Sequence, residues 1–253
     1  MGITSSSGGE SGVVEIVLDF PPVNALPIGG WHALATELRA VTPEARVVVL
    51  RAGTEVRGFC AGVDIKELQR GPRHLALVDV NRACAEAFAA VYECAVPVIA
   101  AVHGFCLGGG VGLVGNADLV VASRDASFGL PEVDRGALGA ATHLARLVPQ
   151  QRMRHMVYSC ERASAEELLG YGSVLRVVER AELLATARAV AAQIAAKDPR
   201  VVRMAKEALN AIDPVDVNRS YRFEQGFTME LNLAGVSDDL RDTFVNEKGV
   251  GER

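Results

Sequence analysis

The stretch VPVIAAVHGFCLGGGVGLV, residues 96–114, places a glycine-rich turn between two apolar runs. Its first half is a continuous run of Val, Ile and Ala, which is typical of a strand buried on both faces. The glycines at 108–110 leave the backbone open to a ligand, and a helix that begins there would add partial positive charge. The stretch therefore predicts a strand, a loop and a helix, with backbone N–H groups that face a ligand.

The same design recurs in residues 47–68, VVVLRAGTEVRGFCAGVDIKEL. Here too a buried strand leads through small residues into a helix, and Ala61 stands where Gly109 stands in the other stretch. If the two loops converge, their N–H groups would form an oxyanion hole, in which one donor is worth about 3 kcal/mol of transition-state stabilisation. The alternative is that the glycines only allow the backbone to pack closely.

Residues 110–115 also match G-x-G-x-x-G, the fingerprint of dinucleotide-binding loops. A dinucleotide-binding unit needs a full helix before its next strand. Only Asn116 and Ala117 separate the last glycine from the apolar run DLVVAS, so we interpret the match as accidental. The sequence also has no G-K-[ST] motif of a phosphate-binding P-loop.

Length and composition indicate one large domain, or one domain with a smaller appendage. The 253 residues are 49% apolar and carry a net charge of −5 without a basic block. This balance argues against nucleic acid and anionic membranes as partners. The five cysteines show no C-x-x-C spacing and the five histidines show no ligand spacing, so neither disulfides nor a metal site is predicted.

The two ends of the chain differ from its middle. Residues 1–11, rich in Ser and Gly, predict a flexible tail and lack the pattern of a signal peptide, so we expect a cytoplasmic protein. Strands and helices alternate over residues 12–195, which predicts an α/β core. Residues 196–253 have helical periodicity only, and we expect them to form a helical C-terminal region.

Two short stretches, DIKE and FGLPEVDRG, supply the candidate carboxylates. In DIKE, Asp64 and Glu67 form the pattern of a helix capping box, which explains Asp64 without catalysis. Glu132 follows a proline in FGLPEVDRG, and a carboxylate beside an apolar cleft would have a raised pKa. Asp134 would share a face with Glu132 in extended chain. An ion pair with Arg135 is the alternative role for either acid.

Together these motifs resemble the crotonase (enoyl-CoA hydratase/isomerase) superfamily over nearly the whole chain. The resemblance is carried by PPVNAL, GFCAGVDIKEL, VPVIAAVHGFCLGGGVGLVGNADLVVAS, ASFGLPEV and SDDLRDTFVNEK, in that order. It implies an α/β fold with a crotonase-like ββα spiral core, and a helical C-terminal region that builds homotrimers or dimers of trimers. It also implies an acyl-CoA thioester as substrate, with no further cofactor. The thioester oxygen would accept hydrogen bonds from the N–H groups of Ala61 and Gly109.

The resemblance further implies where coenzyme A would lie. Its adenine and pantetheine arm would contact the backbone around Ala61, Val63, Asp64 and Ile65. Lys248 matches the place of a basic residue that faces a CoA phosphate, and a solvated tail lysine is the alternative.

The sequence departs from the hydratase pattern at one acid. Hydratases that it resembles usually carry two glutamates; one is present as Glu132, whereas the other position holds Gly112. The stretch GALGAATHLARLV is altered as well and introduces His143, a further candidate acid–base group. His103 stands where asparagine is common, and a histidine that ends a buried strand is more often structural.

Two reactions fit a single remaining acid. In an isomerase, Glu132 would move a proton between carbons of an unsaturated acyl chain. In a hydrolase, water activated by Glu132 would attack a ring ketone and break a C–C bond, with Gly112 leaving room for a bulky ring. The sequence most resembles the bacterial steroid-degradation branch that opens a bicyclic indene-carboxyl-CoA, which favours the hydrolase. An ordinary hydratase and a non-catalytic CoA-binding protein are the alternatives.

Overall fold

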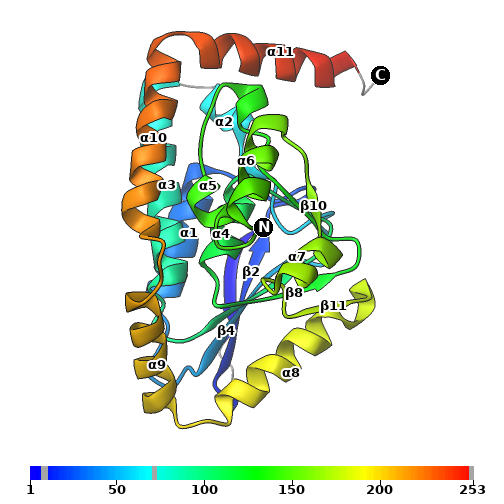
Figure 1. Cartoon of the computed structure of the whole chain (residues 1–253), viewed down its shortest axis with the longest axis vertical. Coiled ribbons are helices and arrows are strands. Elements are labelled where there is room, and N and C mark those ends of the chain that lie inside the picture. The colour runs from blue at the N-terminus through cyan, green and yellow to red at the C-terminus, as the bar shows by residue number, and fades with distance from the viewer. Residues whose placement is uncertain (7–10, 70–72, 251–253) are drawn as a thin grey trace.

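Among the described residues, six strands form the main sheet of the protein (Figure 1). The computed structural model describes residues 1–6, 11–69 and 73–250, without the side chains of residues 73–74 and 244–250. The strand order is β1-β2-β4-β6-β8-β11, in which β1 and β2 are antiparallel and the other neighbours are parallel. The strands are Gly2–Ser6 (β1), Val13–Asp19 (β2), Val47–Ala52 (β4), Val98–Val102 (β6), Leu119–Ser123 (β8) and Arg176–Val178 (β11).

The apolar runs of the sequence form the centre of this sheet. Every residue of β6 is buried, and Arg51 is the one residue of β4 that is not fully buried. Because helices cover both faces of a parallel sheet, its central strands carry apolar side chains on both sides. The prediction of buried strands at these segments is therefore confirmed.

The N-terminus differs from the predicted flexible tail of residues 1–11. Gly2–Ser6 pairs with β2 as an edge strand, and Ile3 packs against the hydrophobic core. An edge strand is hydrogen-bonded on one side only and can be short and polar. Its Ser-rich sequence therefore gave no strand signal, and the prediction was wrong for these residues.

Two smaller sheets bring the glycine-rich loops together. β7 pairs with β9, which pairs with β10, and β3 pairs with β5. A single bridge joins Cys60 in the first loop to Cys106 in the second. The strands are Ala25–Leu26 (β3), Gly62–Val63 (β5), Phe105–Leu107 (β7), Ser127–Gly129 (β9) and Ala163–Ser164 (β10). The convergence of the two loops, which the oxyanion-hole hypothesis requires, is thus present.

Helices cover both faces of the main sheet. Helix α8 packs on one face, where Leu183 and Ala187 join Val49 and Ile99 in a hydrophobic cluster. Helices α1, α3 and α4 contribute to the larger core on the other face. Residues 110–115 lie inside α4, which contradicts a dinucleotide-binding loop. These helices are Ile28–Arg39 (α1), Arg73–Tyr92 (α3), Gly109–Asn116 (α4) and Leu183–Ala195 (α8).

The remaining helices are shorter or belong to the C-terminal part. Helices α9 and α10 run along one side of the molecule, and α11 crosses its upper end (Figure 1). Helix α5 ends at Leu144, and Pro149 precedes the first residue of α6. None of the described helices is long and apolar enough to cross a membrane. The bounds are Ile65–Leu68 (α2), Ala141–Leu144 (α5), Gln150–Ser159 (α6), Ala165–Tyr171 (α7), Pro199–Ala211 (α9), Val217–Leu233 (α10) and Val236–Val250 (α11).

Candidate active site

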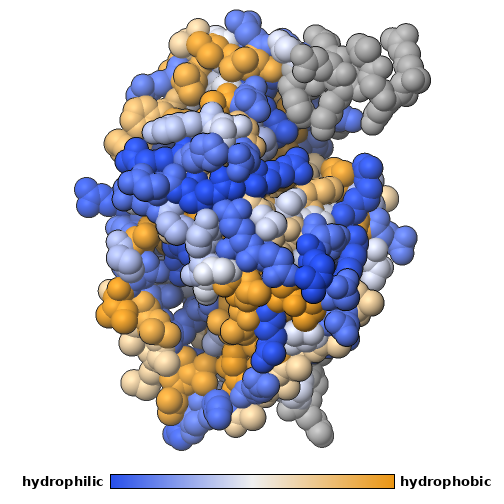
Figure 2. Space-filling model, turned by 45° about the vertical axis from the view of Figure 1, so that its right-hand side comes forward, coloured by the Kyte–Doolittle hydropathy of each residue, from blue (hydrophilic) through white to orange (hydrophobic). Residues whose placement is uncertain are grey.

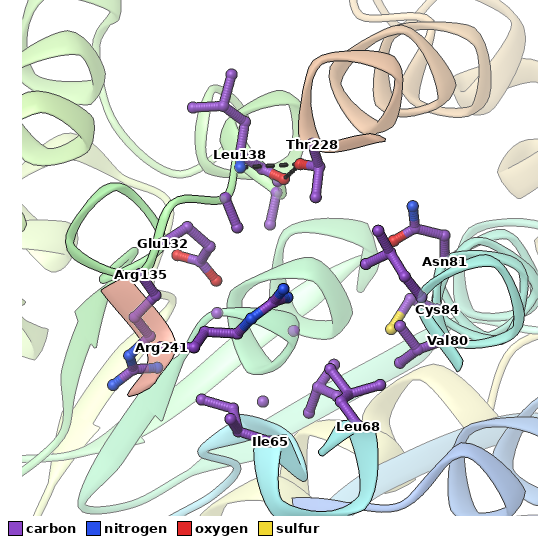
Figure 3. Close-up of a pocket in the computed structure, with 18 of the residues that line it drawn as sticks. Ile65, Leu68, Val80, Asn81, Cys84, Glu132, Arg135, Leu138, Thr228 and Arg241 are labelled. Carbon is purple, nitrogen blue, oxygen red and sulfur yellow. Dashed lines mark hydrogen bonds between the residues drawn. The ribbon is translucent and has the colours of Figure 1, made fainter. Parts of the chain in front are cut away.

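A cavity of about 830 Å³, open mouth included, lies between the two glycine-rich loops and the C-terminal helices. Its wall is mostly apolar, as is usual for sites that bind small molecules. Several separate elements supply its polar side chains, of which all but Tyr221 are labelled in Figure 3: Asn81, Glu132, Arg135, Tyr221, Thr228 and Arg241. The large apolar side chains in the wall include Ile65, Leu68, Leu77, Val80, Phe88 and Leu138.

The second glycine-rich loop ends in a tight turn at the start of α4. Gly108 adopts φ 55° and ψ −117°, and its N–H donates to the Gly129 carbonyl at 3.0 Å. The first amides of a helix have no carbonyl partner within it. No acceptor for the Gly109 N–H exists among the described residues, so this amide is available to a ligand in the cavity.

Gly62 lies beside Gly109 and holds the two loops in contact. Its φ of +91° lies in the region that favours glycine, and a Cβ there would be 3.2 Å from the Gly109 nitrogen. A Cβ on Gly110 would be 2.8 Å from the Cys60 carbonyl oxygen. The glycines therefore serve both predicted purposes, because they allow close packing and leave an amide uncovered.

The structure corrects the prediction for Ala61. The Ala61 N–H donates to the Asn24 carbonyl at 3.0 Å, because β5 pairs with β3 and extends this ladder. The Asp64 N–H is likewise bound by Leu26 at 2.9 Å. The Val63 amide lies between these two in the chain, after the turn at Gly62, and neither carbonyl accepts from it. Val63 lines the cavity and is the better candidate for the second donor.

Glu132 enters the cavity beside the second loop (Figure 3). It precedes a 3-10 turn at Val133–Arg135, which follows β9. A Cβ on Gly108 would lie 2.5 Å from Glu132 Oε1, so the absence of a side chain at Gly108 makes room for this carboxyl group. Glu132 Oε2 is buried and has no hydrogen-bond partner among the described residues. One oxygen of the carboxyl group is therefore free for a substrate or a water molecule.

Burial raises the pKa of Glu132 from 4.5 to about 8, and the nearby charge of Arg135 offsets this only in part. The carboxylate of Glu224 raises this pKa further. Glu224 itself accepts from the N–H groups of Ala141 and Thr142 and so holds the start of α5. A carboxyl group that titrates near neutrality can both take and return a proton, which is the property of a general acid–base.

Asp134 and His143, the other predicted acid–base groups, do not join Glu132. The 3-10 turn removes the extended geometry in which Asp134 would share a face with Glu132, and Asp134 is exposed. His143 is 1% exposed and packs edge-on against Phe88, behind the cavity wall. Burial lowers the pKa of His143 to about 3, so the ring is neutral. Both residues were predicted wrongly because their placement depends on turns and distant packing.

Gly112 does not leave room for a bulky ring. A Cβ on Gly112 would be 2.2 Å from Cζ of Phe88, and Gly112 is buried in α4 without lining the cavity. The ring of Phe88, from α3, fills the space in which the second acid of the hydratase pattern would stand. That expectation was wrong because the space freed by a missing side chain was assigned to the ligand instead of to a neighbouring side chain.

The residues predicted to contact coenzyme A lie in the first loop and α2. Val63 and Ile65 line the cavity, whereas Asp64 caps α2 by accepting from the Lys66 N–H at 2.9 Å. Glu67 accepts from the Ile28 N–H at 2.7 Å and links α2 to α1, so the capping box is only half formed. The side chain of Lys248 lies outside the described residues.

Two further predictions concern histidines and metals. His103 follows β6, is 8% exposed and does not line the cavity, and burial lowers its pKa to about 4. Within the described part of the chain, no three His, Cys, Asp or Glu side chains are grouped so that they could hold a metal ion.

Four polar residues of the cavity were not among the predicted site residues. Tyr221 and Thr228 come from α10, Asn81 from α3 and Arg241 from α11. Each lies far in sequence from the glycine-rich loops, and only the fold brings it to them. A weak signal existed for Arg241, which is part of the motif SDDLRDTFVNEK at the end of the chain.

Comparisons with known proteins agree with this geometry. The enoyl-CoA hydratase/isomerase family model matches residues 8–231. The chain is 62% identical to the (7aS)-7a-methyl-1,5-dioxo-2,3,5,6,7,7a-hexahydro-1H-indene-carboxyl-CoA hydrolase of Rhodococcus jostii, over 97% of this chain and 95% of the relative. It is 59% identical to the Mycobacterium tuberculosis protein of the same name, over 98% of this chain and 100% of that protein.

A solved structure shows the same fold. The enoyl-CoA hydratase/isomerase from Xanthobacter autotrophicus matches with a TM-score of 0.81 and 28% identity, over 91% of this chain and 87% of that one. The family model covers both glycine-rich loops and Glu132. The protein therefore belongs to the enoyl-CoA hydratase/isomerase, or crotonase, family.

Proposed function

We propose that this protein opens a ring of a steroid-derived bicyclic indene-carboxyl-CoA thioester by hydrolysis of a C–C bond. The observation that carries the proposal is Glu132, the single acid of the cavity wall among the described residues; within the same residues its buried Oε2 has no partner, and the Gly109 N–H in the same wall has no acceptor. Two relatives at 62% and 59% identity carry the name of a hydrolase of such a thioester.

In the proposed reaction, the N–H groups of Val63 and Gly109 bind the thioester oxygen. The ionised carboxylate of Glu132 takes a proton from water, and the resulting hydroxide adds to the carbonyl carbon of a ring ketone. The tetrahedral alkoxide then collapses and the adjacent ring C–C bond breaks. Its electron pair passes into the conjugated thioester, whose enolate oxygen is stabilised by the two amides.

The reaction closes when the protonated Glu132 returns its proton to the enolate carbon. One water molecule has then been added, the thioester is intact, and the ketone carbon has become a carboxylic acid that ionises in water. No cofactor is required beyond the coenzyme A portion of the substrate. A neighbouring acid is not needed, which suits a cavity in which Phe88 fills the space of the second hydratase glutamate.

An isomerase would also need only one acid, so the two activities must be distinguished by the products that the protein forms from defined substrates. We expect the protein to add one water molecule to the bicyclic dioxo-indene-carboxyl-CoA, detected as a mass increase, while a thiol reagent detects no free coenzyme A. Crotonyl-CoA should not be hydrated at a comparable rate. Rapid hydration of crotonyl-CoA, or release of coenzyme A from the bicyclic substrate, would reject ring opening as the activity.

We also propose that copies of the chain assemble as a trimer or a dimer of trimers through the C-terminal helices. Large apolar side chains are exposed there, and Figure 2 shows hydrophobic surface at the upper end of the molecule, where α10 meets α11. Such patches mark contacts in soluble proteins. The exposed apolar side chains of the C-terminal helices include Phe223 and Leu233 on α10, and Met204, Leu209 and Ile212 on α9 or directly after it, toward the other end of the molecule. Native mass spectrometry should give three or six copies, and a monomer would contradict the proposal.

A further inference from the structure

Arg241 is a cation inside the cavity that the proposed mechanism leaves without a role. It comes from α11, its side chain is 12% exposed, and it lines the cavity with Glu132. Figure 3 shows its guanidinium group extending across the centre of the cavity, away from Arg135. Arg135, and not Arg241, is the cation that lowers the Glu132 pKa, so the two arginines act on different parts of the site.

One nitrogen of the Arg241 guanidinium group is fixed by the protein. Its Nη2 donates to Asp238 Oδ1 at 2.7 Å and to Asn232 Oδ1 at 2.5 Å. The side-chain amide of Asn232 in turn donates to the Thr228 carbonyl at 2.7 Å. These contacts tie the orientation of Arg241 to α10, so the guanidinium group is held in place before a ligand arrives.

The other two nitrogens of the guanidinium group have no protein partner among the described residues. Neither Nε nor Nη1 of Arg241 donates to an acceptor among the described residues. The wall opposite is apolar and includes Leu68 and Val80. These N–H groups are not among the fully buried atoms without a partner, so a molecule in the cavity can reach them, and charged guanidinium donors of this kind bind an acceptor or an anion.

The proposed substrate has such an acceptor. The thioester oxygen is bound by the backbone amides, and an unsubstituted acyl chain would offer Arg241 nothing further. Building on the proposed function, we propose that Arg241 binds the oxygen of the ring ketone that water attacks, and the carboxylate that this ketone becomes. When hydroxide adds, the carbonyl π electrons move to that oxygen beside Arg241; when the C–C bond breaks, the C=O bond re-forms. The carboxylic acid then gives its proton to water, and the resulting carboxylate pairs with the guanidinium group.

Binding measurements test this role without relying on turnover. Two thioesters are compared by calorimetry: cyclohexenecarboxyl-CoA, and the same ring with a carboxyethyl group. The unaltered protein should prefer the carboxylated ligand by about tenfold or more, as expected for a charge-assisted pair. Arg241→Gln should lose this preference while still binding cyclohexenecarboxyl-CoA within about twofold. Arg241→Lys should retain part of it, and Arg219→Gln, at an exposed position of α10, should retain all of it.

Each result decides the role of Arg241. Equal weakening of both ligands in Arg241→Gln, or no preference in the unaltered protein, would overturn the proposal. Ring opening of the bicyclic substrate should fall about 100-fold in Arg241→Gln, as for other donors to a developing oxyanion. If the unaltered protein opened no ring, the proposed function would fail, while the two binding constants would still decide whether Arg241 recognises the carboxylate.

Discussion

The ring of Phe88 occupies the place that a side chain at residue 112 would take. A Cβ built on Gly112 lies 2.2 to 2.6 Å from three carbons of this ring. Phe88 also contacts Trp31 and His143 edge-on, at centroid distances of 5.7 and 4.9 Å. Close packing of this kind leaves little freedom for the ring to move. The missing hydratase acid is therefore replaced by core packing in this protein.

Restoring the acid should damage the protein instead of creating a hydratase. Gly112→Glu places a carboxyl group against Phe88 and should lower the free energy of unfolding by about 2–4 kcal/mol, with loss of activity on ring and linear thioesters alike. Chemical denaturation measures the effect. Adding Phe88→Ala should recover part of the loss, since the two sites share one space. Wild-type stability in Gly112→Glu would show that the ring can move aside.

Glu132→Gln should lower kcat by about 100-fold or more, with the affinity for the thioester nearly unchanged. The ionised carboxylate is the proton acceptor, and its pKa is raised to about 8. For the unaltered protein, kcat/KM should therefore rise with pH up to about pH 8 and then level off. A pH–rate profile in which this limb persists in Glu132→Gln would assign it to another group.

The same substitution should stabilise the protein in alkaline solution. A carboxyl group whose pKa is raised on folding, here from 4.5 to about 8, favours the folded state below the lower value and loses this contribution as pH rises to the higher one. Glu132→Gln removes the loss and should be more stable than the unaltered protein at pH above 8, by roughly 1–4 kcal/mol. Unfolding free energies measured from pH 5 to pH 9 test this, with exposed Glu207→Gln as the control.

Gly62→Ala should show whether the Gly109 amide takes part in the reaction, because the effect on activity can be compared with that of an equally strained position. Gly62 has φ +91° and lies against the Gly109 nitrogen, whereas Gly172 has φ +81° and nothing within 4 Å of a Cβ. Both Gly62→Ala and Gly172→Ala should cost about 1 kcal/mol of stability or somewhat more. Only Gly62→Ala should also lose turnover, because its methyl group covers the Gly109 amide. Equal activity in the two variants would remove this amide from the mechanism.

Local sequence patterns predicted several elements of the fold correctly. The Val-rich runs at 47–52 and 98–102 became buried parallel strands, and the glycines at 108–110 became the turn before α4. These patterns are readable because burial on both faces and positive φ leave direct marks on residue type. β1 left no such mark, since an edge strand of five residues needs few apolar side chains.

The features of the candidate site likewise fall into those that the sequence predicts and those that only the tertiary structure shows. The sequence by itself determined the family resemblance and, through it, Glu132 and the two glycine-rich loops as the candidate site, because the motifs that carry this resemblance are local stretches of the chain. Only the tertiary structure decided that Asn24 binds the Ala61 amide, that Phe88 fills the space beside Gly112, and that Arg241 enters the cavity. Each of these contacts joins segments far apart in the chain, and residue spacing within one segment carries no information about a partner in another.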